Sequence, residues 1–160
     1  MKYSEGKADE LKKQFWKSLA DSPFLMLQRD DDPKSAAPMT AQIDKDANSA
    51  IWFFTQKNST FAKLGDVTAT YEGKDHEVFV RFHGRLQVEE DQGRFEQFWN
   101  NFVKAWYDQG KDDPDLLFLR MDLGDAEIWS GDYSLLTTAK MALGKTVHDD
   151  VQDKHVETTL

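Results

Sequence analysis

The stretch HEVFVRFHGRLQVE, residues 76–89, shows the clearest periodicity in the sequence. Apolar and polar side chains alternate along it, so that one face of an extended strand is apolar and the other is polar. The apolar face carries Val78, Val80, Phe82, Gly84, Leu86 and Val88. A long strand with one face inside and one face outside is typical of a small β-barrel. This stretch therefore predicts the fold class.

The segments around this strand predict further strands and several helices. Apolar residues at helical spacing indicate helices over residues 8–20, 94–110 and 132–144, and a shorter one over 59–64. Other strands are predicted at residues 24–28, 36–44, 50–55, 67–71 and 116–129, with a turn at 29–35, a hairpin turn at 45–49 and a bulge at Gly124. Pro38 indicates that the 36–44 strand lies at a sheet edge or a bulge.

The short connections between these elements favour a mainly β fold over a doubly wound parallel sheet. We expect a β-barrel of about six mostly antiparallel strands with peripheral helices. Its 160 residues suit one core, so we predict a single domain over residues 1–144. Residues 145–160 are predicted to form a polar, loosely held tail.

The composition excludes several classes of function. The chain has 20 basic and 29 acidic residues, a net charge of −9, so a large nucleic-acid interface is not expected. No apolar run is long enough to cross a membrane and the N-terminus lacks the apolar part of a signal peptide, so a cytoplasmic location is predicted. There is no cysteine, which excludes disulfides, thiolate nucleophiles and cysteine-ligated metals.

Known catalytic and calcium-binding motifs are absent or incomplete. The stretch DKDANS, residues 44–49, resembles the start of a calcium loop. However, Ser49 replaces the required glycine and Thr55 replaces the bidentate glutamate, so a hairpin turn is the better interpretation. No nucleophile elbow, Walker loop or dinucleotide-binding glycine pattern occurs, and the sequence identifies no catalytic residue.

The four histidines do not predict a metal site. His76 and His83 are seven residues apart on one predicted strand, so their side chains point to opposite faces. His148 and His155 lie in the predicted tail. We therefore predict no metal site.

The stretch AIWFFTQKNSTFAKLGD, residues 50–66, is the best candidate for a binding site from the residues alone. It predicts a strand that ends at Thr55 and is followed at once by a short helix. Backbone N–H groups, hydroxyl groups and the positive end of a helix dipole favour a phosphate at such a junction. The side chains available there are Lys57, Asn58, Ser59, Thr60 and Lys63. The alternative is an ordinary capped surface helix, with Trp52 and Phe54 in the core.

The order of several motifs resembles a known protein family. PMTAQID (38–44), IWFFTQKNS (51–59), FHGRLQVEED (82–91) and FWNNFVKAWYDQGKDDPDLLFLRMDLGDAEIW (98–129) follow one another and precede a helix that ends in glycine. Over about residues 8–144 this series resembles the general stress protein branch of the pyridoxamine 5'-phosphate oxidase-like family. The resemblance implies a split β-barrel homodimer with two flavin sites at the dimer interface. The implied flavin is FMN, with FAD as the alternative.

The resemblance also implies which residues contact the flavin. It places the strand around Pro38–Gln42 along the isoalloxazine ring, and the junction after Thr55 near the ribityl chain and the phosphate. The flavin-binding residues implied by the resemblance are Met39, Thr40, Gln42, Phe54, Thr55, Gln56 and Ser59, together with Trp129 from the second subunit. Lys57 and Lys63 are added as candidate flavin-binding residues because they bring positive charge to the same junction.

Two positions depart from the family pattern. An arginine that commonly precedes the Pro-Met pair is Ala37 in this chain, and a lysine two residues after the serine is Phe61. Both are phosphate ligands in the oxidases, so Lys57 or Lys63 would have to replace them, which a flexible ammonium group allows. No second basic cluster is evident for a substrate phosphate, so pyridoxamine phosphate oxidation is not predicted.

Two functions follow from these observations. The first is a stress-related oxidoreductase that uses bound flavin for electron transfer to an unknown small substrate. The second is a non-catalytic dimeric barrel that acts as a binding or structural module with a degenerate flavin pocket. In both cases we expect a homodimer, because the apolar strand faces and the aromatic residues from Phe95 to Trp106 exceed what a small barrel can cover.

Overall fold

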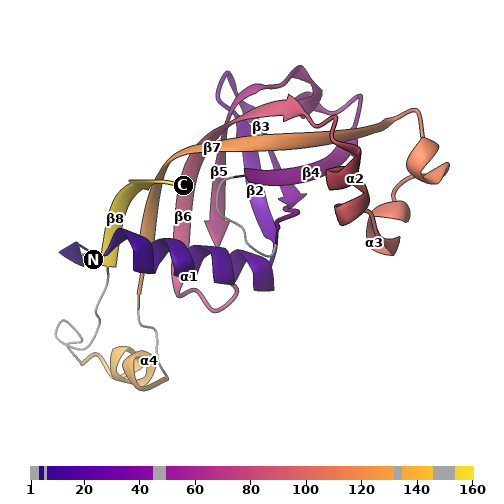
Figure 1. Cartoon of the computed structure of the whole chain (residues 1–160). Helices are drawn as coiled ribbons and strands as arrows, with labels where there is room; N and C mark the ends of the chain where they lie inside the picture. Colours follow the sequence, from indigo (N-terminus) through magenta and orange to yellow (C-terminus); the bar gives the residue numbers. More distant parts are fainter. Residues whose placement is uncertain (1–3, 6, 45–49, 132–134, 146–153) are drawn as a thin grey trace.

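A computed structural model describes residues 4–5, 7–44, 50–131, 135–145 and 154–160 (Figure 1). The helices are α1 (Ala8–Asp21), α2 (Gln92–Phe98), α3 (Asn101–Lys104) and α4 (Leu135–Ala142), with the short 3₁₀ helices η1 (Thr60–Lys63) and η2 (Gly110–Asp112). The strands are β1 (Ser4–Glu5), β2 (Phe24–Arg29), β3 (Asp32–Thr40), β4 (Ala50–Gln56), β5 (Gly65–Glu72), β6 (Val78–Val88), β7 (Leu116–Ser130) and β8 (Lys154–Thr159).

The strands form one curled sheet in which β7 connects the two ends of the molecule (Figure 1). The strand order is β1-β8-β7-β6-β5-β2-β3, and β4 pairs with β7 outside this path. β6 occupies one edge of β7, while β4 pairs with residues 116–122 and β8 with residues 125–130 along the other edge. Every pair is antiparallel except β1 with β8. The predicted split β-barrel with peripheral helices is therefore confirmed.

Strand β6 has the alternation that the sequence predicts. It begins at Val78, so His76, which was predicted on the same strand, lies in the preceding turn. The buried side chains of β6 are Val78, Val80, Phe82 and Leu86. The pairing with β7 changes register where Gly124 and Asp125 lie opposite His83, which confirms the predicted bulge at Gly124.

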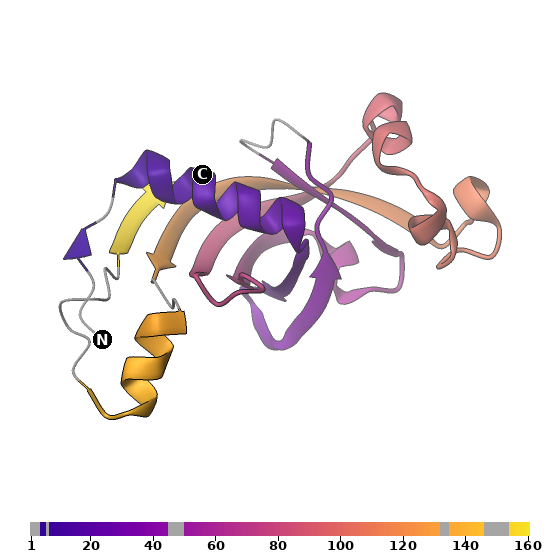
Figure 2. The same ribbon diagram turned by 90° about the horizontal axis from the view of Figure 1, so that it is seen from below.

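Helix α1 crosses one face of the sheet and packs against β6, β7 and β8 (Figure 2). Its apolar side carries Leu11, Phe15 and Leu19, all buried, as the helical spacing predicts. The ring of Phe15 lies 5.8 Å from that of Tyr71 and 5.4 Å from that of Phe82, measured between centroids. These contacts join the helix to the main core of the barrel.

Strand β4 lies between two apolar clusters, so side chains on both of its faces are buried. Ile51 and Phe53 face the main core. Trp52 faces a second cluster with Phe98 and Phe118, against which Phe54 packs. The prediction that Trp52 and Phe54 are core residues holds for Trp52, which is 5% exposed, whereas Phe54 is only partly buried.

The predicted hairpin between residues 36–44 and 50–55 is wrong. β3 pairs with β2, and β4 pairs with β7. Only an isolated bridge between Gln42 and Trp52 connects the two segments, and the predicted turn 45–49 lies outside the described residues. β3 begins at Asp32, so much of the predicted turn at 29–35 is strand. The expectation that Pro38 marks an edge is confirmed, because β3 ends the sheet path.

The predicted helix 94–110 is wrong as a continuous element. Two short helices, α2 and α3, replace it because Asn100 is extended and starts a new helix. Its side-chain oxygen accepts hydrogen bonds from the N–H groups of Phe102 and Val103 at 2.9 and 3.0 Å. The expected aromatic stripe is therefore divided: Phe98 is buried, whereas Phe102 and Trp106 are exposed.

The prediction of a loosely held tail is wrong for residues 154–159. These residues form β8, which pairs with β7, and its Val156 belongs to the main core. The predicted helix 132–144 is observed as α4, while its expected first residue, Asp132, lies outside the described residues. The sequence does not predict this strand because β8 is mostly polar, with Val156 as its buried residue.

Candidate functional site

A cleft of about 630 Å³ lies where the end of β3 meets β4 and α3. Met39, Thr40 and Gln42 line it from β3 and the residues that follow, and Phe54 lines it from β4. Helix α3 and the turn after it contribute Phe102, Trp106 and Tyr107. The lining is largely apolar with a few polar groups, and this volume is within the range of small-molecule sites, about 300–1,000 Å³.

The end of β3 presents backbone hydrogen-bonding groups toward this cleft. The N–H of Ala41 donates to the carbonyl of Pro23, on the β2 side. The N–H of Gln42 donates to the carbonyl of Trp52, on the opposite side. Since successive residues of an extended chain point their N–H and C=O groups to opposite sides, those of Thr40 point away from β2. No described strand pairs with that edge of β3, so these groups are available to a ligand.

Tyr107 joins the cleft to the end of β4. Its side chain is 6% exposed, and its hydroxyl donates a hydrogen bond of 2.6 Å to the carbonyl oxygen of Thr55. Burial, together with the nearby carboxylate of Asp113, raises the pKa of Tyr107 from 10.0 to about 12. The phenol therefore stays neutral and a donor throughout the physiological range.

We expect the stability of the protein to fall as the pH rises above 10, in part through Tyr107. A raised folded-state pKa means that the neutral phenol stabilises the folded chain. This contribution is complete below the unfolded-state pKa of 10.0 and is lost as the pH approaches about 12. Tyr107→Phe should remove the part of the pH dependence that comes from this phenol. It should also lower the free energy of unfolding at neutral pH by about 1 kcal/mol, because the hydrogen bond to Thr55 is lost.

Thermal unfolding between about pH 8 and 12 measures this effect. Burial also raises the pKa of Tyr71, so the pH dependence of the variant should be smaller than that of the wild type without disappearing. Identical pH profiles for the variant and the wild type would contradict the assignment to Tyr107.

Aromatic packing holds Phe54 in place but leaves other aromatic residues exposed. The Phe54 ring stacks on Phe118 with centroids 4.6 Å apart, so its orientation is fixed. By contrast, Phe102 is 86% exposed and Trp106 is 79% exposed. Phe24, which also lines the cleft, is 64% exposed. Such an exposed aromatic group beside an apolar cleft indicates a surface that binds a ligand or a partner.

The structure brings together some of the predicted site residues and separates others. Met39, Thr40, Gln42 and Phe54 line the cleft, and Thr55 is bonded to Tyr107 of its lining. Gln56, Lys57, Ser59 and Lys63 follow along the turn beyond β4 and are not part of the lining. Trp129 is near the end of β7, where it stacks on His155. Within one chain it does not belong to the cleft.

Comparison with protein families matches residues 10–153 to the model described as pyridoxamine 5'-phosphate oxidase like. The chain belongs to the pyridoxamine 5'-phosphate oxidase-like family. Solved structures place it in the general stress protein branch of this family. The curated proteins include no significant match. Among the described residues no helix is long and apolar enough to span a membrane.

Three solved structures illustrate this relationship. A protein assigned to the general stress family from Xanthomonas campestris pv. campestris is 40% identical, with a TM-score of 0.72, and the match covers 81% of this chain and 93% of that one. The general stress FMN/FAD binding protein of Xanthomonas citri is 37% identical, with a TM-score of 0.72 and coverage of 80% and 94%. A general stress protein 26 from Jannaschia sp. CCS1 is 25% identical, with a TM-score of 0.81 and coverage of 96% and 100%.

In this pyridoxamine 5'-phosphate oxidase-like protein, the turn after β4 is built around a capped 3₁₀ helix. The hydroxyl of Ser59 accepts a hydrogen bond from the N–H of Phe61 at 3.2 Å, as the capped-helix alternative requires. Phe61 is 2% exposed and packs in the main core. Lys57 and Lys63 are exposed on either side of it.

Several residues near the site could not be found from the sequence. The spacing of Phe102 and Trp106 predicts one continuous helix over residues 94–110, with Tyr107 inside it, which gives no reason to place these three residues beside β3. Arg29 is also buried, and its guanidinium donates to the Thr60 hydroxyl at 3.1 Å and pairs with Asp31. The sequence predicts that Arg29 begins the turn 29–35, before an acidic run, and this gives no signal that it supports the turn after β4.

Proposed function

We propose that this protein binds FMN in the cleft between β3, β4 and α3 and uses it as a flavin-dependent oxidoreductase. One observation carries the proposal: Met39, Thr40, Gln42 and Phe54 line a single cleft. The family resemblance implies that these four residues contact the isoalloxazine ring. The FMN/FAD binding relative of Xanthomonas citri supports a flavin as the ligand. A cytoplasmic location without a nucleic-acid partner remains a prediction.

The residues of the cleft fit the chemistry of a flavin ring. Phe54, Phe102 and Trp106 offer aromatic surface for a flat, largely apolar ring system. The backbone groups of Thr40 and the amide of Gln42 offer donors and acceptors for its polar edge. A bound flavin would supply the redox chemistry, while the chain would orient the ring and limit the access of water. The substrate and the electron donor are not specified by these residues.

The flavin phosphate is proposed to lie at the turn after β4. Tyr107 lines the cleft and bonds to Thr55, and this turn follows Thr55 closely along the chain. Ala37 and Phe61 cannot provide the charge that the oxidases use there. We propose that Lys57 and Lys63 provide it, because both are exposed and carried on flexible side chains. FAD remains the alternative flavin.

A homodimer is proposed because the cleft continues into a second exposed apolar surface. A hollow beside it is lined by Phe24, Met26, Pro38 and Phe79, and Phe24 and Pro38 line both. Phe79 lies opposite Trp129 in the β6–β7 pairing, so this surface extends to Trp129. A second copy of the chain would cover these groups. We propose that it also brings its own Trp129 to the flavin.

The second candidate function is a dimeric barrel without flavin, acting as a binding or structural module. The observation that favours it is the burial of Phe61, which places a core residue where the oxidases have a phosphate-binding lysine. Ala37 likewise packs against the core and offers no charge. In this case the purified protein would be colourless and would not be stabilised by FMN.

Titration of the flavin-free protein with FMN decides between these two functions. FMN at about 100 times its Kd should raise the free energy of unfolding by about 2.7 kcal/mol. That corresponds to an increase in melting temperature of about 5–10 °C. Thr40→Tyr, at an exposed position of the cleft, should weaken binding at least about tenfold by filling the ring site.

Two controls make this experiment specific. Ala36→Tyr places the same side chain at an exposed position of β3 outside the cleft and should bind FMN as the wild type does. Replacing both Lys57 and Lys63 by alanine should weaken FMN binding about ten- to a hundredfold and leave riboflavin binding unchanged, since only FMN carries the phosphate. No flavin binding by the wild type, at any concentration tested, would favour the structural module.

A further inference from the structure

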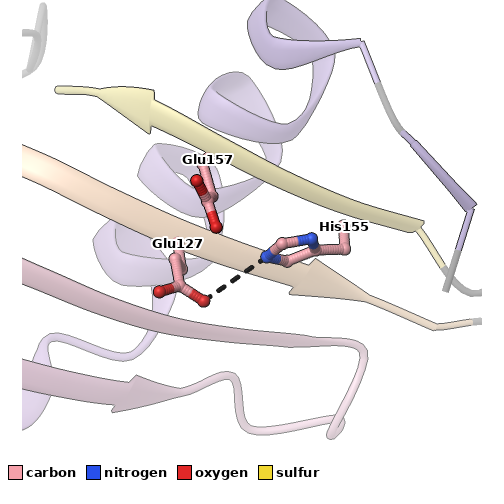
Figure 3. A group of neighbouring side chains, drawn as sticks. All are labelled: Glu127, His155 and Glu157. Atoms are coloured by element: carbon pink, nitrogen blue, oxygen red, sulfur yellow. Dashed lines mark ion pairs between the residues drawn. The ribbon is translucent and has the colours of Figure 1, made fainter.

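The pairing of β7 with β8 brings together three potential metal ligands that are far apart in the sequence. Glu127 lies directly opposite Glu157, and the neighbouring pair is Trp129 with His155. Because side chains alternate along a strand, all four share one face of the sheet. Ile128 and Val156 face the core on the opposite side. Figure 3 shows Glu127, His155 and Glu157 pointing toward one another.

The spacing of these groups suits a metal ion. One ligand atom from each of Glu127, His155 and Glu157 lies within 4.8 Å of the other two. The Nε2 atom of His155 is 3.5 Å from the Oε2 atom of Glu127, which is longer than an ordinary hydrogen bond. Two ligands of a tetrahedral zinc ion are separated by about 3.4 Å, given zinc–ligand bonds of about 2.1 Å. Small rotations of Glu157, which is exposed, would complete the site.

Neighbouring residues hold two of these ligands in position. The indole of Trp129 stacks on the His155 ring, with centroids 5.3 Å apart and an angle of 28° between the planes. Arg81 of β6 pairs with the Oε1 atom of Glu127. The other carboxylate oxygen, Oε2, is the one directed at His155. Partners of this kind orient ligands at established metal sites.

The local charge favours a cation. Two glutamates placed directly opposite each other on paired strands repel each other. Arg81 offsets the charge of only one of them, and the adjoining hollow of about 420 Å³ also contains Asp125. Glu127 and Glu157 both line this hollow and Glu157 is exposed, so an ion could enter from solvent and keep water as a further ligand.

We propose that Glu127, His155 and Glu157 bind a divalent transition-metal ion that fastens β8 to β7. One imidazole nitrogen and two carboxylate oxygens form a mixed donor set that suits Zn²⁺ better than Mg²⁺, which prefers oxygen alone. Three protein ligands leave one position for water. The proposed role is structural, because the ion would join β8 to β7, which also pairs with β6 and β4.

Calorimetric titration of the chelator-treated full chain with zinc chloride tests the proposal. We expect one zinc ion per chain and no comparable binding of magnesium chloride. His155→Ala and Glu157→Gln should each weaken zinc binding at least about tenfold. Glu157 is exposed, and its replacement by glutamine keeps the shape of the side chain, so this variant should fold.

His83→Ala is the matched control, because His83 is exposed and lines the same hollow without belonging to the three ligands. It should bind zinc with the affinity of the wild type. Zinc should also slow hydrogen exchange of the β8 amides in the wild type but not in Glu157→Gln. Absence of zinc binding, or an unchanged affinity in either ligand variant, would overturn the proposal.

Discussion

Phe15→Ala should lower the free energy of unfolding by about 3–5 kcal/mol, which is typical for truncation of a buried phenylalanine. Phe15 is fully buried, and its ring contacts Tyr71 of β5 and Phe82 of β6. Truncation would leave a cavity between α1 and the sheet that these large neighbours cannot fill. The melting temperature should fall by about 6–20 °C.

Urea unfolding followed by circular dichroism measures the effect of this substitution. Lys13→Ala is the control, because Lys13 is exposed on the same helix and its replacement should change stability by less than about 0.5 kcal/mol. The free energy of unfolding should fall with urea concentration at the same slope for the wild type and both variants, which would show that the unfolding transition itself is unchanged. A loss below about 1 kcal/mol for Phe15→Ala would contradict the docking of α1 on the sheet.

The elements that could be predicted from the sequence are those whose two faces differ in polarity. Helix α1 and strand β6 each have one buried and one exposed side, so their periodicity identifies both the element and its inner face. The bulge at Gly124 was also predictable, because glycine interrupts an otherwise regular strand. In these cases local chemistry and the final packing agree.

Pairing partners could not be predicted in the same way. Residues 36–44 and 50–55 suggested a hairpin because they are neighbours in sequence, but β4 is apolar on both faces. A strand of this kind is stabilised between two apolar clusters. It pairs with β7, from Ala50 opposite Asp122 to Gln56 opposite Leu116, which is far along the sequence. Periodicity reports which face is buried and carries no information about which strand supplies the hydrogen bonds.

The candidate site was predicted only in part for a related reason. The resemblance implied Met39, Thr40, Gln42 and Phe54, and all four line the cleft. Helical spacing does not predict that Phe102 of α3, and Trp106 and Tyr107 after it, line the cleft. Asn100 caps a new helix and redirects the chain after α2, a local effect that the spacing does not reveal. The polar sequence of residues 145–160 predicts a tail and not a strand, so it does not indicate that His155 lies beside Glu127.

Gly84→Ala should lower the free energy of unfolding by about 3 kcal/mol, at the upper end of the cost of overpacking. A Cβ atom at this position would lie 2.4 Å from the carbonyl oxygen of Asp122 and 2.7 Å from the Met121 side chain. The oxygen belongs to the backbone of β7, so relief of the contact requires β6 and β7 to move apart beside their bulge. Glycine is therefore required here by the close approach of two strands.

Gly124→Ala is the matched control, because Gly124 lies in the same bulge on the opposing strand. Among the described residues, its added Cβ would meet the carbonyl oxygen of His83 alone, at 3.5 Å, which is an ordinary contact. Alanine there should be tolerated, or should stabilise the protein by up to about 1 kcal/mol by restricting the unfolded chain. Comparable losses in both variants would mean that the bulge needs backbone freedom at both glycines. A loss of stability in Gly84→Ala alone would show that glycine is required at position 84 by the short distance between β6 and β7.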